Sequence, residues 1–211
     1  DSIQELRRRK GRDEKPFAVM VADLEAAHHF TELDPMEQRL LSHSARPIVV
    51  AQSRGILPGN LAPGLNRLGI MLAYAPVHHL VFDALARISA DLPVALVATS
   101  ANPGDEPLVA DHDDAGRRLV AIADMIVSHD RDIIVRADDS VVQVMAGAPA
   151  FLRRSRGFVP DPVDLGSDGP SVIALGADLK NTICVTRGRE AFVSQHIGGL
   201  DNAETIRFQR E

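Results

Sequence analysis

Short apolar runs alternate with amphipathic segments through the first 155 residues of the chain. The apolar runs at 17–21, 47–51, 68–72, 94–98, 125–128 and 140–146 have the length of strands, and 151–154 extends the last of them. Helical patterns occupy 2–9, 23–30, 34–44, 76–88 and 111–122. Asp23 and Asp34 stand at N-cap positions, and Glu37 completes a capping box with Asp34. This alternation predicts an α/β fold with helices flanking a sheet.

A different pattern follows residue 157. Residues 157–171 are rich in proline and glycine with little apolar periodicity, so we predict a linker over 158–170 between a domain at 1–157 and a second segment at 171–211. Strands are predicted at 172–176, 182–187 and 191–195, with a tight turn at Arg187-Gly188-Arg189, and a helix at 202–209. About 40 residues without disulfides rarely fold alone, so we expect this segment to be the start of a larger domain.

Composition narrows the class of protein. With 45% hydrophobic residues in 211, the chain suits a globular protein, and no apolar run approaches the ~20 residues that span a bilayer. The charged start carries no signal peptide pattern. Cys184 is the one cysteine, which excludes an internal disulfide, and its apolar neighbours predict a buried strand position. Together these features predict a cytoplasmic protein.

The net charge of −6 hides two basic clusters, at 7–12 and 153–156. Local basic patches in an acidic protein favour a small anionic ligand over a nucleic-acid duplex. Aromatic residues make up 4% of the chain, which argues against single-strand binding by base stacking.

Two polar clusters are candidates for binding that anion. Lys10, Arg12 and Lys15 surround a glycine turn, where backbone amides and cations can meet phosphate oxygens. Ser100 and Asn102, with Thr99 before them, follow the apolar run 94–98, and ligands of open α/β sheets lie beyond the carboxyl ends of strands. The alternatives are a solvated charged loop and an ordinary turn.

A third cluster joins Ser140, which follows two aspartates, to the arginines at 153–156. Adjacent residues of a strand point to opposite faces, so Asp138 and Asp139 do not form a metal pair, and we interpret Ser140 as a hydroxyl contact beside a phosphate-binding arginine. The pairs His28-His29 and His78-His79 fail as metal ligands because neighbours on a helix do not share a face. P-loop, GxGxxG, GxSxG and HExxH motifs are absent from the sequence.

Several stretches taken in order carry a family resemblance. KGRDEKP, TSANPGDEP and DDSVVQVMAGAPAFLRRSRG resemble the YrdC-like nucleotide-binding domain, and ALGADLKNTICVTRGREAFVSQHIGGL is similar to the HypF-type hydrogenase maturation carbamoyltransferases. The resemblance covers essentially the whole chain. It implies a YrdC/RibB-like twisted mixed sheet flanked by helices, followed by the first strands of an actin-like (ASKHA) domain.

The resemblance also implies an activity and its residues. HypF-type enzymes form carbamoyl adenylate from carbamoyl phosphate and ATP with Mg²⁺, and pass the carbamoyl group to the C-terminal cysteine of a HypE-type partner for the cyanide ligand of [NiFe] hydrogenase. Lys10 and Arg12 match the family's Lys-x-Arg motif, and Ser100 and Asn102 match its Ser-x-Asn motif. The pocket implied for ATP and the adenylate comprises Lys10, Arg12, Lys15, Thr99, Ser100, Asn102, Ser140, Arg153 and Arg156.

The chain also departs from the family pattern. Ala101 stands where glycine is usual, and the family's zinc and iron sites fall outside these residues, so no metal site is expected here. We expect a fragment that begins inside the first domain and does not complete carbamoyl transfer. Alternatives are threonylcarbamoyl-AMP synthase for tRNA modification, a small-molecule O-carbamoyltransferase, and a non-catalytic module that binds double-stranded RNA. Membrane partners are not expected.

Overall fold

The computed structural model describes residues 2–89, 92–104, 106–201 and 203–210, and the chain forms two compact units. The first takes the described residues of Asp1–Arg7, Arg12–Thr99 and Asp139–Arg153. The second takes those of Arg8–Gly11, Ser100–Asp138 and Arg154–Glu211. Helix α1 (Ser2–Lys10) contributes residues to both.

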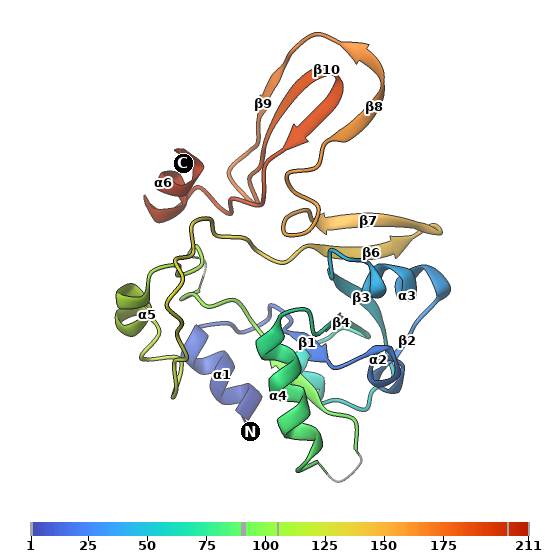
Figure 1. Cartoon of the computed structure of the whole chain (residues 1–211), viewed down its shortest axis with the longest axis vertical. Helices are drawn as coiled ribbons and strands as arrows, with labels where there is room; N and C mark the ends of the chain where they lie inside the picture. Colours follow the sequence, from blue (N-terminus) through green and yellow to red (C-terminus); the bar gives the residue numbers. More distant parts are fainter. Residues whose placement is uncertain (1, 90–91, 105, 202, 211) are drawn as a thin grey trace. The chain divides into compact units, whose positions relative to one another are not determined.

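A mixed sheet of seven strands forms the first unit, in the order β5-β1-β4-β3-β6-β7, with β2 paired to β3 (Figure 1). Parallel pairing joins β1 to β4 and β3 to β6, and the other pairs are antiparallel. This sheet confirms the predicted α/β class. Its strands are β1 (Ala18–Val21), β2 (Thr31–Glu32), β3 (Ile48–Ser53), β4 (Arg67–Leu72), β5 (Ala95–Ala98), β6 (Val141–Met145) and β7 (Ala148–Arg153).

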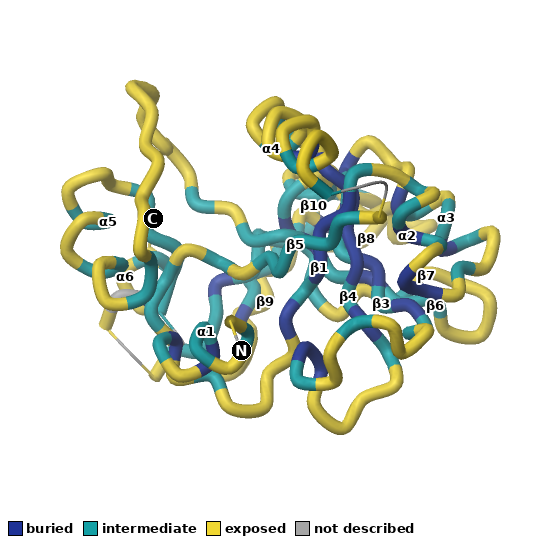
Figure 2. The backbone as a smooth tube through the Cα atoms, turned by 90° about the horizontal axis from the view of Figure 1, so that it is seen from below, coloured by how far each residue is buried: buried dark blue, intermediate teal, exposed yellow. Residues whose placement is uncertain are grey.

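Helices cover both faces of this sheet. Asp23 caps α2 (Leu24–Phe30), and Asp34 and Glu37 form the predicted capping box of α3 (Pro35–Ser42). Val19, Ile70 and Leu41 lie in the core shared with α2, α3 and the 3₁₀ turn η1 (Gly59–Leu61). Met71 packs on the other face against Phe82 of α4 (Pro76–Ala86). The buried residues therefore follow β1, β4 and β3 through the middle of the sheet (Figure 2).

The second unit contains a three-stranded antiparallel sheet in the order β8-β10-β9. Its elements are β8 (Val163–Gly169), β9 (Ile173–Leu175), β10 (Ile183–Val193), α5 (His112–Arg118) and α6 (Ala203–Arg210). Apolar side chains of this sheet are exposed, including Ile173 and Leu175 of β9. Cys184 lies in β10 as expected, but it is half-buried where full burial was predicted.

In the second unit, strand pairing overrides local composition at one segment. Residues 163–169 form β8 and pair with β10, although they lie in the segment 158–170 that the sequence predicted as a linker. The predicted turn at 187–189 is confirmed: β10 comprises the two arms of a hairpin, because the Ser194 amide donates to the Ile183 carbonyl at 2.7 Å. Gly188 has a φ of 60°, the left-handed conformation that glycine adopts readily, and it lies where the chain reverses between the two arms.

The predicted strand at 125–128 is wrong, since these residues have no regular structure and Met125 and Val127 are each 80% exposed. An apolar run becomes a strand only where another strand pairs with it. Helix α5 ends at Arg118, four residues before the predicted end at 122. In the parts of the chain that the structure covers, no helix has both the length and the apolar character required to cross a bilayer.

Candidate functional site

Lys10, Ser100 and Asn102 come together in the second unit. Lys10 ends α1 and is 5% exposed. Its ammonium donates to the Ser100 carbonyl at 2.6 Å, to the Asn102 carbonyl at 2.9 Å and to Asn102 Oδ1 at 3.3 Å. A buried ammonium is stable only where acceptors replace water, and three oxygens do so here. The Lys-x-Arg lysine and the Ser-x-Asn turn thus form one hydrogen-bonded cluster.

The turn after β5 is held by its own side chains as well. Ser100 Oγ donates to Asn102 Oδ1 at 2.6 Å, and the Asn102 amide group donates to the Glu106 carbonyl. Gly104 lies so close to α1 that a Cβ there would meet the Lys10 carbonyl at 3.0 Å. Sequence reasoning missed Gly104, although a glycine soon after the Ser-x-Asn motif is a visible sign of close backbone approach.

A network of ion pairs lies next to Glu106, the residue whose carbonyl accepts from Asn102. Arg118 of α5 contacts the Glu106 carboxylate and donates to Asp114 Oδ2 at 2.8 Å. The hydrogen bond from Arg118 lowers the pKa of Asp114, and the same bond raises the pKa of Arg118. Asp111 caps α5 by accepting from the Asp114 amide at 2.8 Å. Sequence reasoning missed Arg118, whose spacing from Asp114 fits an i,i+4 pair but whose contact with Glu106 depends on the fold.

Arg12 and Thr99 meet in the first unit. Arg12 Nη1 donates to Thr99 Oγ1 at 3.3 Å, and its other nitrogens donate to the Lys15 and Pro16 carbonyls at 3.2 and 2.5 Å. Its guanidinium lies 4.8 Å from the centre of the Phe17 ring. Residues 12–15, which we call the basic turn, therefore hold the Arg12 side chain against the end of β5.

The pairing of β5 with β1 produces this contact. The sequence argument placed Thr99 beyond the carboxyl end of a strand in an open sheet, and this strand, β5, is antiparallel to β1 and pairs Ala98 with Ala18. The end of β5 consequently lies beside the start of β1, where the basic turn enters the sheet. Arg12 and Thr99 meet because of antiparallel pairing.

The remaining predicted residues have distinct environments. Lys15 is exposed, whereas Ser140 is fully buried and its carbonyl accepts from the Ile48 amide at 2.8 Å. Arg153 ends β7 and is half-buried. The Arg156 amide donates to the Asp138 carbonyl at 3.1 Å, so this arginine is anchored by its backbone. The ligand roles of these residues stay predictions.

Arg154 of the cluster at 153–156 is hydrogen-bonded within its own turn. Its Nη2 donates to the Phe158 and Asp161 carbonyls at 2.7 and 2.6 Å. Beside the same turn, Asp138 Oδ2 lies 3.2 Å from His196 Nδ1. These contacts tie residues 154–161 and 196 into the second unit.

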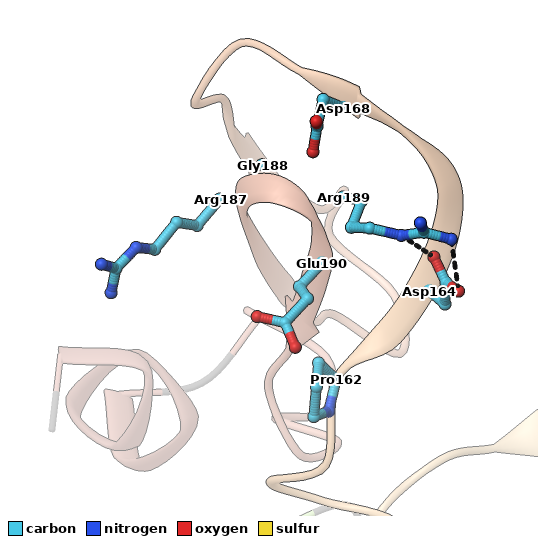
Figure 3. Close-up of a pocket in the computed structure, with 7 residues that line it drawn as sticks. All are labelled: Pro162, Asp164, Asp168, Arg187, Gly188, Arg189 and Glu190. Atoms are coloured by element: carbon cyan, nitrogen blue, oxygen red, sulfur yellow. Dashed lines mark hydrogen bonds and ion pairs between the residues drawn. The ribbon is translucent and has the colours of Figure 1, made fainter.

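A separate charged hollow lies between β8 and β10 (Figure 3). Arg189 crosses it to bind Asp164 with two bonds, at 3.0 and 2.9 Å, while Arg187 points away from Asp168. The bonds from Arg189 lower the pKa of Asp164. None of the predicted site residues lines this hollow, which is bounded by Pro162, Asp164, Asp168, Arg187, Gly188, Arg189 and Glu190.

Among the residues that the structure covers, no group of three or more histidine, cysteine or acidic side chains is arranged to hold a metal ion. His78 Nδ1 accepts from the Ala75 amide at 3.3 Å at the start of α4, so this histidine has a capping role. His112 and His129, which look isolated in the sequence, lie edge to face with ring centres 5.3 Å apart.

Comparison with known protein families divides the chain into two matched segments. The Sua5/YciO/YrdC family model, described as "Telomere recombination", matches residues 1–155. The HypF Kae1-like domain model matches residues 167–211. The order of the two segments agrees with the resemblance found in the sequence.

Individual relatives match nearly all of the chain. It is 72% identical to the carbamoyltransferase HypF of Rhizobium leguminosarum bv. viciae over 98% of its length, and 48% identical to the carbamoyltransferase HypF2 of Cupriavidus necator over 97%. It spans 27% of the length of each of these relatives.

Solved structures give the same picture. A crystal structure of full-length HypF in the phosphate- and nucleotide-bound form superposes with a TM-score of 0.88 at 40% identity, over 98% of this chain and 32% of that one. The Sua5 protein of P. abyssi has a TM-score of 0.60 at 17% identity over 76% of this chain and 44% of its own, a likeness of fold alone.

Proposed function

The chain belongs to the Sua5/YciO/YrdC family and continues into a HypF Kae1-like segment, as HypF carbamoyltransferases do, and we propose that it forms the nucleotide-binding part of such an enzyme. The substrates of the proposed reaction are ATP, with its Mg²⁺, and carbamoyl phosphate. The acceptor is the C-terminal cysteine of a HypE-type partner, and the carbamoyl group is destined for the cyanide ligand of [NiFe] hydrogenase.

The proposed adenylation joins two anions. Hydrolysis of carbamoyl phosphate releases carbamate. An oxygen of the carbamate then attacks the α-phosphorus of ATP, the bond from that phosphorus to the oxygen bridging the α- and β-phosphates breaks, and pyrophosphate leaves. The thiolate of the partner cysteine then attacks the carbamoyl carbon and displaces AMP. Negative charge accumulates on the α-phosphate and on pyrophosphate in the first step, so fixed cations and donors stabilise the transition state more than the ground state.

Five cations of the chain are assigned to this task, and the polar residues of the turn orient the nucleotide. The cations are Lys10, Arg12, Lys15, Arg153 and Arg156, and the polar residues are Thr99, Ser100, Asn102 and Ser140. Lys10 and Arg12 are separated by one residue in the sequence, and Thr99 and Ser100 are consecutive. We infer that Lys10 has a second task, since its hydrogen bonds to the Ser100 and Asn102 carbonyls and to Asn102 Oδ1 hold the Ser-x-Asn turn in shape.

The observation that carries the proposal is the Lys10–Asn102 cluster. A buried lysine whose acceptors are a turn carbonyl, a second carbonyl and an asparagine side chain makes that turn depend on a positive charge. The relative whose structure holds phosphate and nucleotide matches 98% of this chain at 40% identity, which supports a nucleotide ligand for it. The match of residues 167–211 to the HypF Kae1-like domain favours a HypF-type enzyme over a single-domain threonylcarbamoyl-AMP synthase.

Calorimetric titration of the 211-residue chain with Mg²⁺-ATP tests the binding step. Lys10→Ala and Asn102→Ala should each weaken binding by roughly tenfold or more, or about 1.4 kcal/mol. Arg87→Ala is the matched control, because Arg87 is an exposed arginine that pairs with Asp83 on α4. Unchanged affinity in both site variants would refute the assignment, and tight, salt-sensitive binding of double-stranded RNA without ATP binding would favour the non-catalytic module.

A further inference from the structure

Arg7 is a buried arginine of the basic cluster that neither family motif includes. It lies on α1, is 4% exposed, and donates to the backbone carbonyls of two separate segments. In the basic turn its Nη1 donates to Arg12, Asp13 and Lys15 at 2.9, 3.0 and 3.1 Å. In η1, the carbonyls of Asn60 and Leu61 accept from its Nε and Nη2 at 2.7 and 3.1 Å.

Charge compensation at Arg7 is unusual. Within the described part of the chain no carboxylate contacts its guanidinium, whose charge is stabilised by carbonyl dipoles and by the Phe17 ring 4.7 Å away. Burying a cation is costly unless every donor is satisfied, and an apolar residue would fill the same space without that cost. We therefore explain the presence of an arginine at this buried position by the backbone segments that its guanidinium binds.

The element it holds most directly is Arg12. The Arg12 amide donates to the Arg7 carbonyl at 3.0 Å, and the Arg12 carbonyl accepts from the Arg7 guanidinium. Both backbone groups of Arg12 are thus fixed by one residue, and both guanidinium groups lie over the same ring, at 4.7 and 4.8 Å from the centre of Phe17. The position of the Arg12 side chain follows from these contacts.

Arg7 also sets the direction of the peptide groups in the turn. In a trans peptide the C=O and N–H bonds point in opposite directions. Because the carbonyls of Arg12 and Asp13 point to Arg7, the amides of Asp13 and Glu14 point away from it. An anion that approaches the outer side of the turn meets N–H donors instead of carbonyl oxygens.

We propose that Arg7 is the positioning residue of the basic turn: it holds Arg12 and the outward amides in place for an anionic phosphate group without touching that group itself. The proposal rests on the proposed function for the identity of the ligand, a nucleotide phosphate. It adds a residue whose contribution passes through the backbone of residues 12–15.

Two measurements on the 211-residue chain test this. Limited trypsin digestion, followed by mass spectrometry, gives the initial rate of cleavage between Arg12 and Asp13, with cleavage after the exposed Arg87 as an internal reference. Titration with Mg²⁺-ATP gives the affinity. The variants are Arg7→Lys, which keeps the charge but has three donors for five carbonyls, Arg7→Ala, and the control Arg8→Ala at the exposed neighbouring position of α1.

We expect cleavage after Arg12 to accelerate and ATP affinity to fall in parallel, in the order wild type, Arg7→Lys, Arg7→Ala, with a loss of about tenfold for Arg7→Ala. Arg8→Ala should match the wild type in both. If Arg7→Ala does not fold, Arg7→Lys carries the test. Affinity loss without faster cleavage, or a wild-type turn in Arg7→Lys, overturns the proposal. Failure of the wild type to bind ATP would instead refute the proposed function, and the cleavage rates would still report on the turn.

Discussion

Lys10 and Asn102 form two hydrogen bonds with each other although 92 positions separate them. The ammonium binds both the backbone carbonyl and the side-chain oxygen of the asparagine, at 2.9 and 3.3 Å. One lysine therefore fixes both the backbone and the rotamer of a residue in a turn. The lysine of the Lys-x-Arg motif therefore stabilises the conformation of the Ser-x-Asn motif.

Replacing Lys10 by alanine should destabilise the chain and weaken nucleotide binding together. The variant leaves the Ser100 and Asn102 carbonyls without their buried donor, which we expect to lower the free energy of unfolding by about 1–3 kcal/mol. Urea denaturation followed by circular dichroism measures this. Lys15→Ala is the control for stability, because Lys15 is exposed and its loss should change the free energy of unfolding little.

Asn102→Asp separates the structural role of Asn102 from its ligand role. The carboxylate still accepts from Lys10 and Ser100 but can no longer donate to the Glu106 carbonyl. We expect the free energy of unfolding to change by less than for Asn102→Ala, because the lysine keeps its acceptor. ATP affinity should nevertheless fall by at least about tenfold through repulsion between carboxylate and phosphate. Equal affinity of Asn102→Asp and wild type would contradict a phosphate near this side chain.

Arg118→Ala should reveal a pH-dependent contribution to stability. Arg118 lowers the pKa of Asp114 in the folded state, so the pair stabilises the fold above the ordinary carboxyl pKa of 3.8 and loses its effect as the pH falls through the lowered value. The difference in stability between wild type and variant should therefore be largest near neutral pH and shrink in acid. Thermal unfolding between pH 3 and 7 measures it, and a constant difference would show that the ion pair contributes nothing.

Local sequence patterns were sufficient for the elements that have their own start and stop residues. Asp23, Asp34 and Glu37 fixed the two helices they cap, and the apolar runs became the central strands β1, β3 and β4. The family motifs led to Lys10, Ser100 and Asn102, which the fold does bring together.

Features that depend on distant partners could not be read locally. The strand predicted at 125–128 lacks a neighbouring strand, whereas β8 forms from a segment of aspartate and glycine because β10 pairs with it. In the sequence, Arg7 is not distinguishable from the other arginines of the charged run. Only the fold shows that it donates to five carbonyls from two segments. Thr99 was assigned from its place at the end of an apolar run, and antiparallel pairing of β5 with β1 is what places it beside Arg12.

Gly104→Ala and Gly116→Ala form a matched pair that tests the close approach of the turn to α1. A Cβ at position 104 would meet the Lys10 carbonyl at 3.0 Å, while one at position 116, inside α5, would meet nothing within 4 Å. We expect the first substitution to destabilise by about 1–3 kcal/mol through overpacking, and to weaken ATP binding by displacing the turn. The second should stabilise by roughly 0.5–1 kcal/mol, since alanine favours a helix over glycine. Urea denaturation of both variants decides: equal effects would mean that the turn does not depend on a small residue at position 104.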